Sequence, residues 1–247
     1  MNEKKIKFYQ IELTSRCDAT CSYCPHGTMS RKKKDITPDI FEQAIKLLDR
    51  ENLWTNFGMP IVELHSFGEG LLMKEKLFYY LDRMKEEEIP WSLSSNGILL
   101  SQNPQMDKKL LSYDGVLEIS IENTNRLVSL DEKVNRINSF LKLHEEVNSK
   151  LIIYLIVFDH DFDFSRIYGS NYRRSYYGKH TWGENDEGGS NCDFLTKDYF
   201  IVQSNGNIAS CCFDATGETS YGDVFNPIYT TNESWRKCKS CKGNEMC

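Results

Sequence analysis

Residues 6–24 read Ile-Lys-Phe-Tyr-Gln-Ile-Glu-Leu-Thr-Ser-Arg-Cys-Asp-Ala-Thr-Cys-Ser-Tyr-Cys, a strand pattern followed closely by Cys17, Cys21 and Cys24. The first part, Ile6 to Leu13, is rich in branched and aromatic side chains, which predicts a β-strand. The three cysteines are separated by gaps of three and two residues. This order, a strand and then a cysteine loop, sets the expectations for the rest of the chain.

The cysteine spacing predicts a metal cluster. Thiolates are the usual ligands of iron–sulfur clusters, and gaps of three and two residues let one loop hold three corners of a cubane and leave its fourth iron free. A zinc site would need a fourth ligand, which His26 could supply. A closed tetrahedral site gives no reason for the aromatic Tyr23 before the last cysteine, so the pattern favours iron and sulfur.

Composition narrows the class of protein. The 247 residues are 40% hydrophobic and 27% charged, enough for one sizeable core with a small appendage. No apolar run is long enough for a membrane span and no signal peptide is visible, so we expect a cytoplasmic protein without a membrane partner. An odd count of nine cysteines then favours metal ligation over disulfides. The net charge of −6 argues against a nucleic-acid partner.

One local run is basic, Arg31-Lys32-Lys33-Lys34, and it follows the cysteine loop. A solvated loop explains it, and contact with an anionic substrate or an electron donor is the alternative.

Strand and helix patterns alternate up to about residue 158. Further strands are predicted at Ile61–Phe67, Trp91–Ser95, Val116–Ile121 and Leu151–Phe158. Helices are predicted at Pro38–Arg50, with Thr37 as N-cap, and at Lys74–Glu88 and Asp131–Val147. Such alternation implies an α/β fold with a parallel sheet.

The cysteine motif, with Tyr23 before its last cysteine, resembles the signature of the radical S-adenosylmethionine (SAM) enzymes, C-x3-C-x2-C. The resemblance implies that Cys17, Cys21 and Cys24 bind a 4Fe–4S cluster, that its free iron chelates SAM, and that Tyr23 lies near the adenine. One electron would then cleave SAM to a 5′-deoxyadenosyl radical. The family also builds a partial (β/α)6 barrel. Only about five units are legible, so the barrel is abbreviated or its last strand lies within Phe162–Trp182.

Three further motifs fall at predicted strand ends, where active sites of parallel barrels lie. Gly68-Glu69 resembles the family's Gly-Gly-Glu motif, whose carboxylate receives the amino group of SAM. Ser95-Asn96-Gly97 resembles its Thr-Asn-Gly turn beside SAM, although taken alone this sequence is better explained by an ordinary strand-ending turn. Ser120 matches a strand serine that often contacts the ribose or carboxylate, but many strands contain a serine.

Glu63 and His65 alternate along the second main strand, so both side chains are expected on one face, inside the barrel. Buried polar groups need partners, and a substrate would provide them. The two residues are therefore candidates for a catalytic role. A hydrogen-bonded structural histidine is the alternative reading of His65.

The C-terminal quarter carries a second cysteine pattern. Tyr199–Gln203 and Ile208–Cys212 flank Ser-Asn-Gly-Asn, which predicts a β-hairpin that brings Cys211 back toward Cys192. The spacing resembles the SPASM auxiliary-cluster extension in its shorter, one-cluster twitch form, with Gly222-Asp223-Val224 and Trp235 near its other marker positions. This implies that one auxiliary 4Fe–4S cluster is bound by Cys192, Cys211, Cys238 and Cys241. Cys212 and Cys247 are left over. Four cysteines also suit zinc, and spacing does not separate the two metals.

The predicted organisation is a radical SAM barrel at 1–182, a polar linker at 183–191 and a twitch-like domain at 192–247. The function implied by the resemblance is hydrogen-atom abstraction from an unactivated C–H bond and oxidative modification of a substrate, with electrons from a flavodoxin- or ferredoxin-type donor. A ribosomally made peptide is the favoured substrate. The alternatives are alcohol oxidation on an aminocyclitol or sugar and a noncatalytic iron–sulfur or zinc scaffold. The sequence leaves the substrate, the reaction outcome and the oligomeric state open.

Overall fold

The structure, a computed structural model, describes residues 5–21, 24–122, 128–157, 162–169, 172–176, 198–212 and 214–228. These residues divide into two compact units. The first unit contains the described residues of 5–16, 24–68 and 198–228, and the second contains those of 17–21 and 69–176. Within these ranges, no helix is long and apolar enough to cross a membrane.

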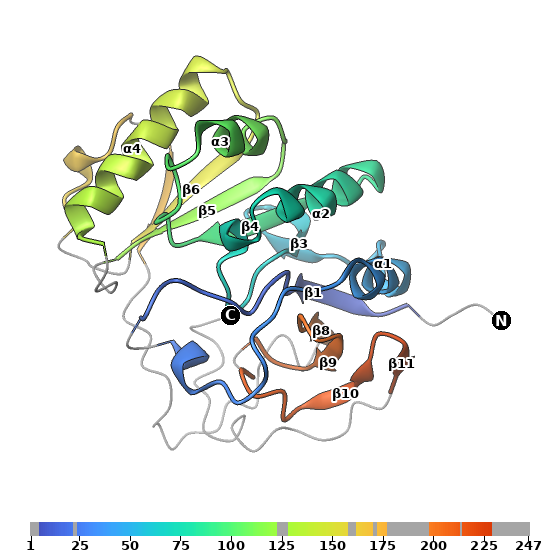
Figure 1. Cartoon of the computed structure of the whole chain (residues 1–247). Coiled ribbons are helices and arrows are strands. Elements are labelled where there is room, and N and C mark those ends of the chain that lie inside the picture. The colour runs from blue at the N-terminus through green and yellow to red at the C-terminus, as the bar shows by residue number, and fades with distance from the viewer. Residues whose placement is uncertain are drawn as a thin grey trace. The chain divides into compact units, whose positions relative to one another are not determined.

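The sheet of the first unit is centred on β1 (Lys7–Ile11), which runs parallel to β3 (Met59–Glu63) on one side and to β8 (Tyr199–Val202) on the other (Figure 1). Gln10 lies directly opposite Glu63 in the register of β1 and β3. The short strand β2 (Trp54–Asn56) pairs antiparallel with β3 through a turn at Phe57 and Gly58, both of which have positive φ.

The C-terminal hairpin extends this sheet. β8 pairs antiparallel with β9 (Asn207–Ala209), as the sequence predicts, and β10 (Ser220–Asp223) and β11 (Asn226–Pro227) follow in order. A strand far along the chain therefore lies beside the first strand. The predicted linker at 183–191 lies outside the described residues, and the predicted domain boundaries stay a prediction.

Helix α1 (Pro38–Leu47) and the 3₁₀ turn η1 (Pro25–Thr28) complete the first unit. Pro38 begins α1, as its fixed φ favours, and Thr37 occupies the N-cap position in extended conformation without a side-chain cap bond. The side chains of Phe41, Ala44 and Leu47 are buried and give the helix its apolar face.

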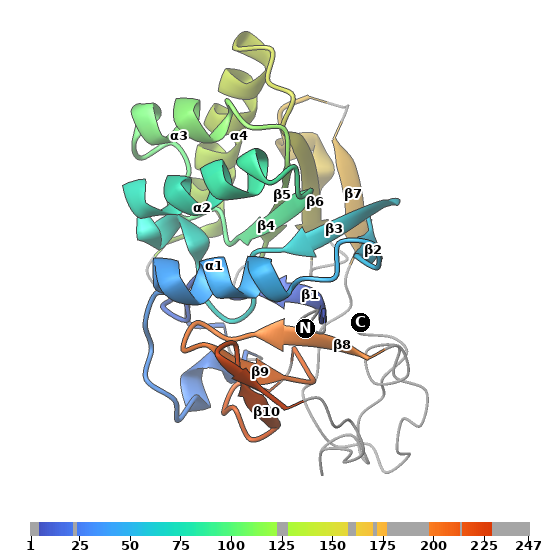
Figure 2. The ribbon, with the colours of Figure 1, turned by 90° about the vertical axis from the view of Figure 1, so that its right-hand side faces the viewer.

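The second unit holds four parallel strands, β4 (Trp91–Ser95), β5 (Val116–Ile121), β6 (Ile152–Val157) and β7 (Arg173–Tyr176). Its helices α2 (Glu75–Glu86), α3 (Pro104–Leu110) and α4 (Leu130–Glu146) lie on one face of the strands (Figure 2). The 3₁₀ turns are η2 (Gly70–Met73) and η3 (Phe164–Arg166). The parallel strands and their helices confirm the predicted α/β class.

Two parts of this unit bear on the sequence predictions. Strand β7 lies within Phe162–Trp182, the stretch expected to hide a sixth strand, and pairs parallel with β6 in the register Tyr154 to Arg173. Helix α3 was not predicted, although its signal is local. Asn103 caps it by accepting hydrogen bonds from the backbone N–H groups of Gln105 and Met106, and Pro104 occupies the first turn.

Candidate functional site

Glu69 is a buried acid of the second unit. It is the N-cap residue of η2 and is only 2% exposed. Its carboxylate accepts three hydrogen bonds, from the backbone N–H of Asn96 at 2.7 Å, from the backbone N–H of Leu71 at 3.0 Å and from Ser95 Oγ at 3.2 Å. All three donors are neutral, so none cancels the negative charge of the carboxylate.

Burial raises the pKa of Glu69 to about 7, because removing a carboxylate from water penalises its charged form. The hydrogen bonds from Asn96, Leu71 and Ser95 oppose this shift but do not cancel it, and the nearby Asp18 adds to it. A buried carboxylate with a raised pKa is a typical feature of a functional site, because a cationic ligand would stabilise its charged form.

Asn96 joins Glu69 to the cysteine segment. Its side-chain Nδ2 donates to Asp18 Oδ1 at 2.8 Å and lies 4.0 Å from Cys17 Sγ. The turn is fixed from within, since Asn96 Oδ1 accepts from the backbone N–H of Ile98. Ser120 Oγ donates to the carbonyl oxygen of Ser95. The structure thus gathers four residues singled out in the sequence, Glu69, Ser95, Asn96 and Ser120, around the carboxyl ends of β4 and β5.

The thiols of the cysteine motif are half-buried. Burial raises the pKa of Cys17 to about 12, opposed by the backbone N–H of Ala19 and reinforced by the charges of Glu69 and Asp18. Burial likewise raises the pKa of Cys24, and Cys21 donates to Glu122 Oε1 at 3.3 Å. No three His, Cys, Asp or Glu side chains in the described ranges are close enough together to hold a metal ion. The donor set nevertheless fits an iron–sulfur cluster, because it consists of three thiols from one short segment.

Lys133 is, like Glu69, a buried charged residue of the second unit. Unlike Glu69, it was not singled out in the sequence. It projects from α4, is 2% exposed, and its Nζ donates to the carbonyl oxygen of Glu122 at 3.4 Å. Burial lowers its pKa, while the charges of Glu122, Cys21, Glu69 and Asp18 oppose that shift. Lys133 thus brings positive charge to a region where acids and thiols accumulate.

Gly68 belongs to the first unit and its need for glycine has a local cause. A Cβ atom on Gly68 would lie 2.0 Å from the carbonyl oxygen of Thr14, so only glycine lets the two segments approach. Gly68 therefore makes room for the backbone of Thr14.

The catalytic candidates Glu63 and His65 lie together in the first unit. Glu63 accepts from Gln10 Nε2 and Asn56 Nδ2, both at 2.8 Å, and His65 Nε2 lies 3.5 Å from Glu63 Oε2. The predicted shared face is therefore observed as a direct contact between the two side chains.

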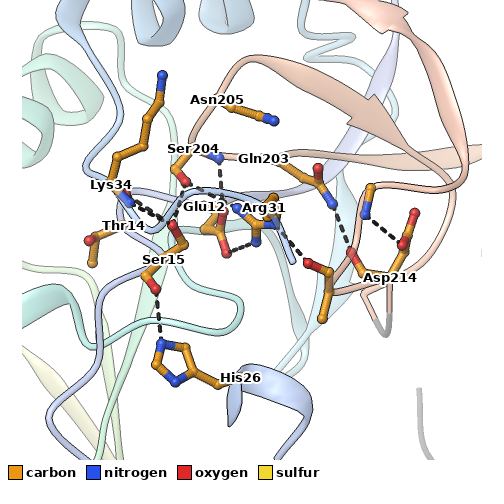
Figure 3. Close-up of polar contacts among 12 residues, drawn as sticks. Glu12, Thr14, Ser15, His26, Arg31, Lys34, Gln203, Ser204, Asn205 and Asp214 are labelled. Atoms are coloured by element: carbon orange, nitrogen blue, oxygen red, sulfur yellow. Dashed lines mark hydrogen bonds and ion pairs between the residues drawn. The ribbon is translucent and has the colours of Figure 1, made fainter. Parts of the chain in front are cut away.

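A buried ion pair joins the segment after the cysteine loop to the residue that follows β1, and hydrogen bonds link both partners to the C-terminal segment (Figure 3). Arg31 Nη2 lies 2.6 Å from Glu12 Oε1, and their side chains are 6% and 0% exposed. Arg31 also donates to Ser204 Oγ and to the carbonyl oxygen of Ala215, while the backbone N–H of Ser204 donates to Glu12 Oε2. The expectation of a solvated or substrate-binding basic run is thus wrong for Arg31, since Glu12 supplies its counter-charge.

The same network reaches both ends of the loop. Ser15 Oγ contacts Ser204 Oγ at 3.1 Å and accepts from the backbone N–H of Lys34 at 2.9 Å. His26, which follows Cys24 closely, places Nε2 3.0 Å from the carbonyl oxygen of Ser15 (Figure 3). Segments distant in sequence are held in one polar network.

The auxiliary cysteines are described only in part. Cys211 and Cys212 follow β9 and are half-buried, and Cys212 packs against the buried Tyr9, Ile201 and Ala209. Cys212 is therefore part of the apolar packing of the first unit. The residues Tyr23, Cys192, Cys238, Cys241 and Cys247 lie outside the described residues.

Asp18, Glu122 and Lys133 are the polar residues of this region that sequence reasoning missed. Asp18 and Glu122 had a positional signal, since one follows Cys17 directly and the other follows a predicted strand. Lys133 had none, because its burial depends on the fold of the whole unit.

Comparison with known proteins gives a fold. No protein-family model matches the sequence, and no curated protein sequence matches it. Among solved structures, anSMEcpe with bound AdoMet is similar with a TM-score of 0.60 and 16% identity over 94% of this chain and 85% of that chain. BtrN in complex with AdoMet and 2-DOIA is similar with a TM-score of 0.54 and 14% identity over 90% of this chain and 80% of that chain. SuiB of Streptococcus suis bound to the precursor peptide SuiA is similar with a TM-score of 0.55 and 14% identity over 92% of this chain and 64% of that chain.

These likenesses show that the chain shares the mixed α/β fold of three proteins whose structures include AdoMet, that is SAM, or a peptide. The fold class expected from the sequence is thereby confirmed.

Proposed function

We propose that the protein is a radical SAM enzyme that oxidatively modifies its substrate. The observation that carries the proposal is Glu69, a buried carboxylate with a pKa of about 7 that is joined through Asn96 to Cys17 and Asp18. A cationic amino group beside a thiol-bound cluster is the ligand arrangement that this chemistry requires. The shared fold with AdoMet-bound structures supports it.

Glu69 binds the amino group of SAM. An ammonium ion at this carboxylate replaces the missing positive charge, and a charge-assisted hydrogen bond in a buried site is stronger than a neutral one. Ser95 and Asn96 hold the carboxylate in place through the bonds already described. Ser120 fixes the backbone of Ser95. Gly68 lets the segment that precedes Glu69 pack closely on Thr14. We assign Tyr23 to the adenine.

Cys17, Cys21 and Cys24 hold the SAM-binding 4Fe–4S cluster. When bound, this cluster supplies the electron that cleaves SAM to a 5′-deoxyadenosyl radical, which takes a hydrogen atom from a substrate C–H bond. Lys133 offsets the negative charge that thiolates, Asp18 and Glu69 bring to the region. We assign Cys192, Cys211, Cys238 and Cys241 to one auxiliary 4Fe–4S cluster in the twitch-like segment 192–247. The barrel occupies 1–182 in this proposal, and 183–191 is the linker.

The proposed substrate is a ribosomally made peptide. SuiB binds a precursor peptide, and anSMEcpe binds AdoMet together with a peptide. The second candidate is oxidation of an alcohol on an aminocyclitol or sugar, which the polar contacts of Glu63 favour because they suit a hydroxyl or amino group. Electrons would come from a flavodoxin- or ferredoxin-type donor. We propose a cytoplasmic location for this redox chemistry.

The test combines metal content with SAM cleavage. After anaerobic reconstitution, the chain is expected to bind about eight irons, and a variant with alanine at Cys17, Cys21 and Cys24 about four. With dithionite, only the unchanged chain should release 5′-deoxyadenosine from SAM. Cys212→Ala is the matched control, because it removes a half-buried thiol to which we assign no cluster.

Iron content separates the alternatives. About four irons falling to none would assign the C-terminal cysteines to zinc or to structure and leave the SAM chemistry standing. Bound iron with no 5′-deoxyadenosine in any preparation would refute the enzyme and favour the scaffold.

A further inference from the structure

Four polar side chains gather on and next to strands β1, β2 and β3 of the first unit. We call them the Glu63 cluster, and they are Gln10, Asn56, Glu63 and His65. Gln10 of β1 and Asn56 of β2 each donate one hydrogen bond to the carboxylate of Glu63, both at 2.8 Å. His65 Nε2 lies 3.5 Å from the same carboxylate. The cluster brings one carboxylate, two amides and one imidazole together.

Gln10 leaves one acceptor unused. The residue is 7% exposed, and its Oε1 is buried without a hydrogen-bond partner among the described residues. The orientation of its amide is fixed, because Nε2 faces the carboxylate of Glu63 and the oxygen would be repelled there. Native proteins rarely bury an acceptor without a donor. The missing partner is therefore a group that donates a hydrogen bond.

The backbone of β1 is irregular next to Gln10. The pairing of β1 with β8 shifts register between Phe8 and Gln10, an irregularity typical of a β-bulge. Bulges commonly re-aim side chains beside functional sites. The register shift is what distinguishes Gln10 from Gln203, another buried glutamine whose Oε1 also has no hydrogen-bond partner among the described residues.

The chemistry of the cluster limits its ligand. A carboxylate repels anions, and a buried set of amides and a carboxylate penalises a purely apolar group. No lysine or arginine forms an ion pair with Glu63 within the described ranges. The negative charge of this carboxylate is therefore available to a cationic ligand. Hydroxyl and ammonium groups satisfy both requirements, since each donates hydrogen bonds and neither is negative.

We propose that the Glu63 cluster is a substrate-recognition site that binds a hydroxyl or ammonium group through Gln10 Oε1 and the Glu63 carboxylate. This inference deepens the proposed function and rests on it, because the bound molecule is a substrate only if the protein is that enzyme. The binding itself does not depend on SAM cleavage. A hydroxylated ring and a hydroxyl-bearing or amine-bearing peptide side chain share this chemistry, and the experiment distinguishes them.

The test is saturation-transfer difference NMR with the full reconstituted chain and four probes, glucosamine, glucose, a Gly-Ser-Gly peptide and a Gly-Lys-Gly peptide with blocked ends. The variants are Gln10→Leu and Glu63→Gln, and Gln203→Leu is the matched control, since Gln203 is a buried glutamine of the same unit outside the cluster. Circular dichroism and the thermal midpoint verify that each variant is folded. The isosteric Glu63→Gln keeps the test valid if Gln10→Leu does not fold.

We expect at least one probe to bind the unchanged chain and the Gln203→Leu variant equally. Gln10→Leu should weaken it at least tenfold. Glu63→Gln should weaken amine probes more than glucose, because only ammonium gains from the negative charge. The pair of peptides or the pair of sugars that binds identifies the source of the donor group.

Binding of no probe at 20 mM, or equal weakening by Gln203→Leu, would overturn the inference. SAM cleavage in the unchanged chain is measured separately. Probe binding without cleavage would refute the proposed enzyme and leave the recognition site standing as a binding site.

Discussion

Glu12 in the first unit and Glu69 in the second are buried to nearly the same extent, 0% and 2% exposed, but their surroundings differ in charge. Glu12 contacts the guanidinium of Arg31 at 2.6 Å and accepts from the backbone N–H of Ser204. Glu69 accepts only neutral hydrogen bonds, and its pKa rises to about 7. The first carboxylate is in direct contact with a cation, whereas no cation of the described residues contacts the second, and Lys133 acts on it only at a distance.

Asp214 shows that neutral hydrogen-bond donors alone can lower the pKa of a buried carboxyl group. Its carboxylate accepts from the backbone N–H groups of Gly217, Glu218 and Thr219 and from the hydroxyls of Thr216 and Thr219. Burial would raise the pKa of Asp214, but these bonds outweigh it and the pKa is lowered. Asp214 accepts five hydrogen bonds and Glu69 three, and Glu69 also lies near the charge of Asp18. The carboxylate with fewer donors is the one expected to bind a ligand.

The largest effect is expected from breaking the completed pair. Arg31→Met leaves Glu12 buried without its counter-charge, which should lower the free energy of unfolding by about 3–5 kcal/mol. Urea denaturation at pH 7 measures the change. Arg16→Met is the matched control, because Arg16 pairs with Asp35 at the surface with a side chain that is 45% exposed, and it should cost no more than about 1 kcal/mol. Equal losses in the two variants would contradict the distinction between them.

A substitution at Glu69 is expected to raise the free energy of unfolding, whereas Arg31→Met lowers it. Its pKa in the folded protein is raised from 4.5 to about 7, so its contribution to stability is present below pH 4.5 and is lost as the pH rises through about 7. Glu69→Gln should therefore raise the free energy of unfolding of the ligand-free chain at pH 8, by up to about 3 kcal/mol.

The measurement for Glu69 is urea denaturation at pH 5 and at pH 8. The gain from Glu69→Gln should be largest at pH 8 and small near pH 5. A loss of stability at pH 8 would mean that the carboxylate is already satisfied by the fold.

Asp214→Asn should destabilise the first unit by about 1–3 kcal/mol at pH 7, because the neutral amide leaves some of the five donors without an acceptor. The unchanged chain should lose the same contribution in acid, as the pH falls below the ordinary aspartate range through the lowered pKa of Asp214. Acid titration of the two proteins by circular dichroism compares them, and a stability difference that persists unchanged at low pH would argue against this account.

The smallest effect is expected from the neighbour of Glu69. Ser95→Ala removes one donor to the carboxylate and should raise the pKa of Glu69 further, at a cost of about 1 kcal/mol in charged-state stability. Ser120→Ala is the control, since Ser120 donates to the carbonyl oxygen of Ser95 and not to Glu69. The pH dependence of unfolding should shift only for Ser95→Ala, and a shift in both variants would count against the assignment.

Local patterns predicted the elements and their order. The strands Trp91–Ser95 and Val116–Ile121 have the predicted bounds. Strand β7 lies within Phe162–Trp182, which was one of the two options that the sequence left open for the last strand. Because the carboxyl ends of parallel strands share an edge, the meeting of Glu69 with Ser95 and Asn96 was also predictable.

What the sequence did not contain is the charge balance. Arg31 reads as part of a basic surface run, and its burial depends on Glu12 and on Ser204, which is 173 residues away in the chain. Lys133 sits in an amphipathic helix, where a lysine usually faces water. The reason for Gly68 was also hidden, because it depends on the path of the backbone at Thr14.

The central claim, that Glu69 awaits the ammonium group of SAM, is tested most directly by the protons released on binding. Calorimetric titration of SAM into the reconstituted chain at pH 6.5, in buffers of different ionisation enthalpy, should show release of more than about half a proton, because the pKa of about 7 leaves Glu69 mostly protonated until the ammonium binds. Glu69→Gln should release about half a proton less than the unchanged chain, because it lacks the titrating carboxyl, and should bind SAM at least tenfold more weakly. Equal affinity and equal proton release in the two proteins would contradict the account.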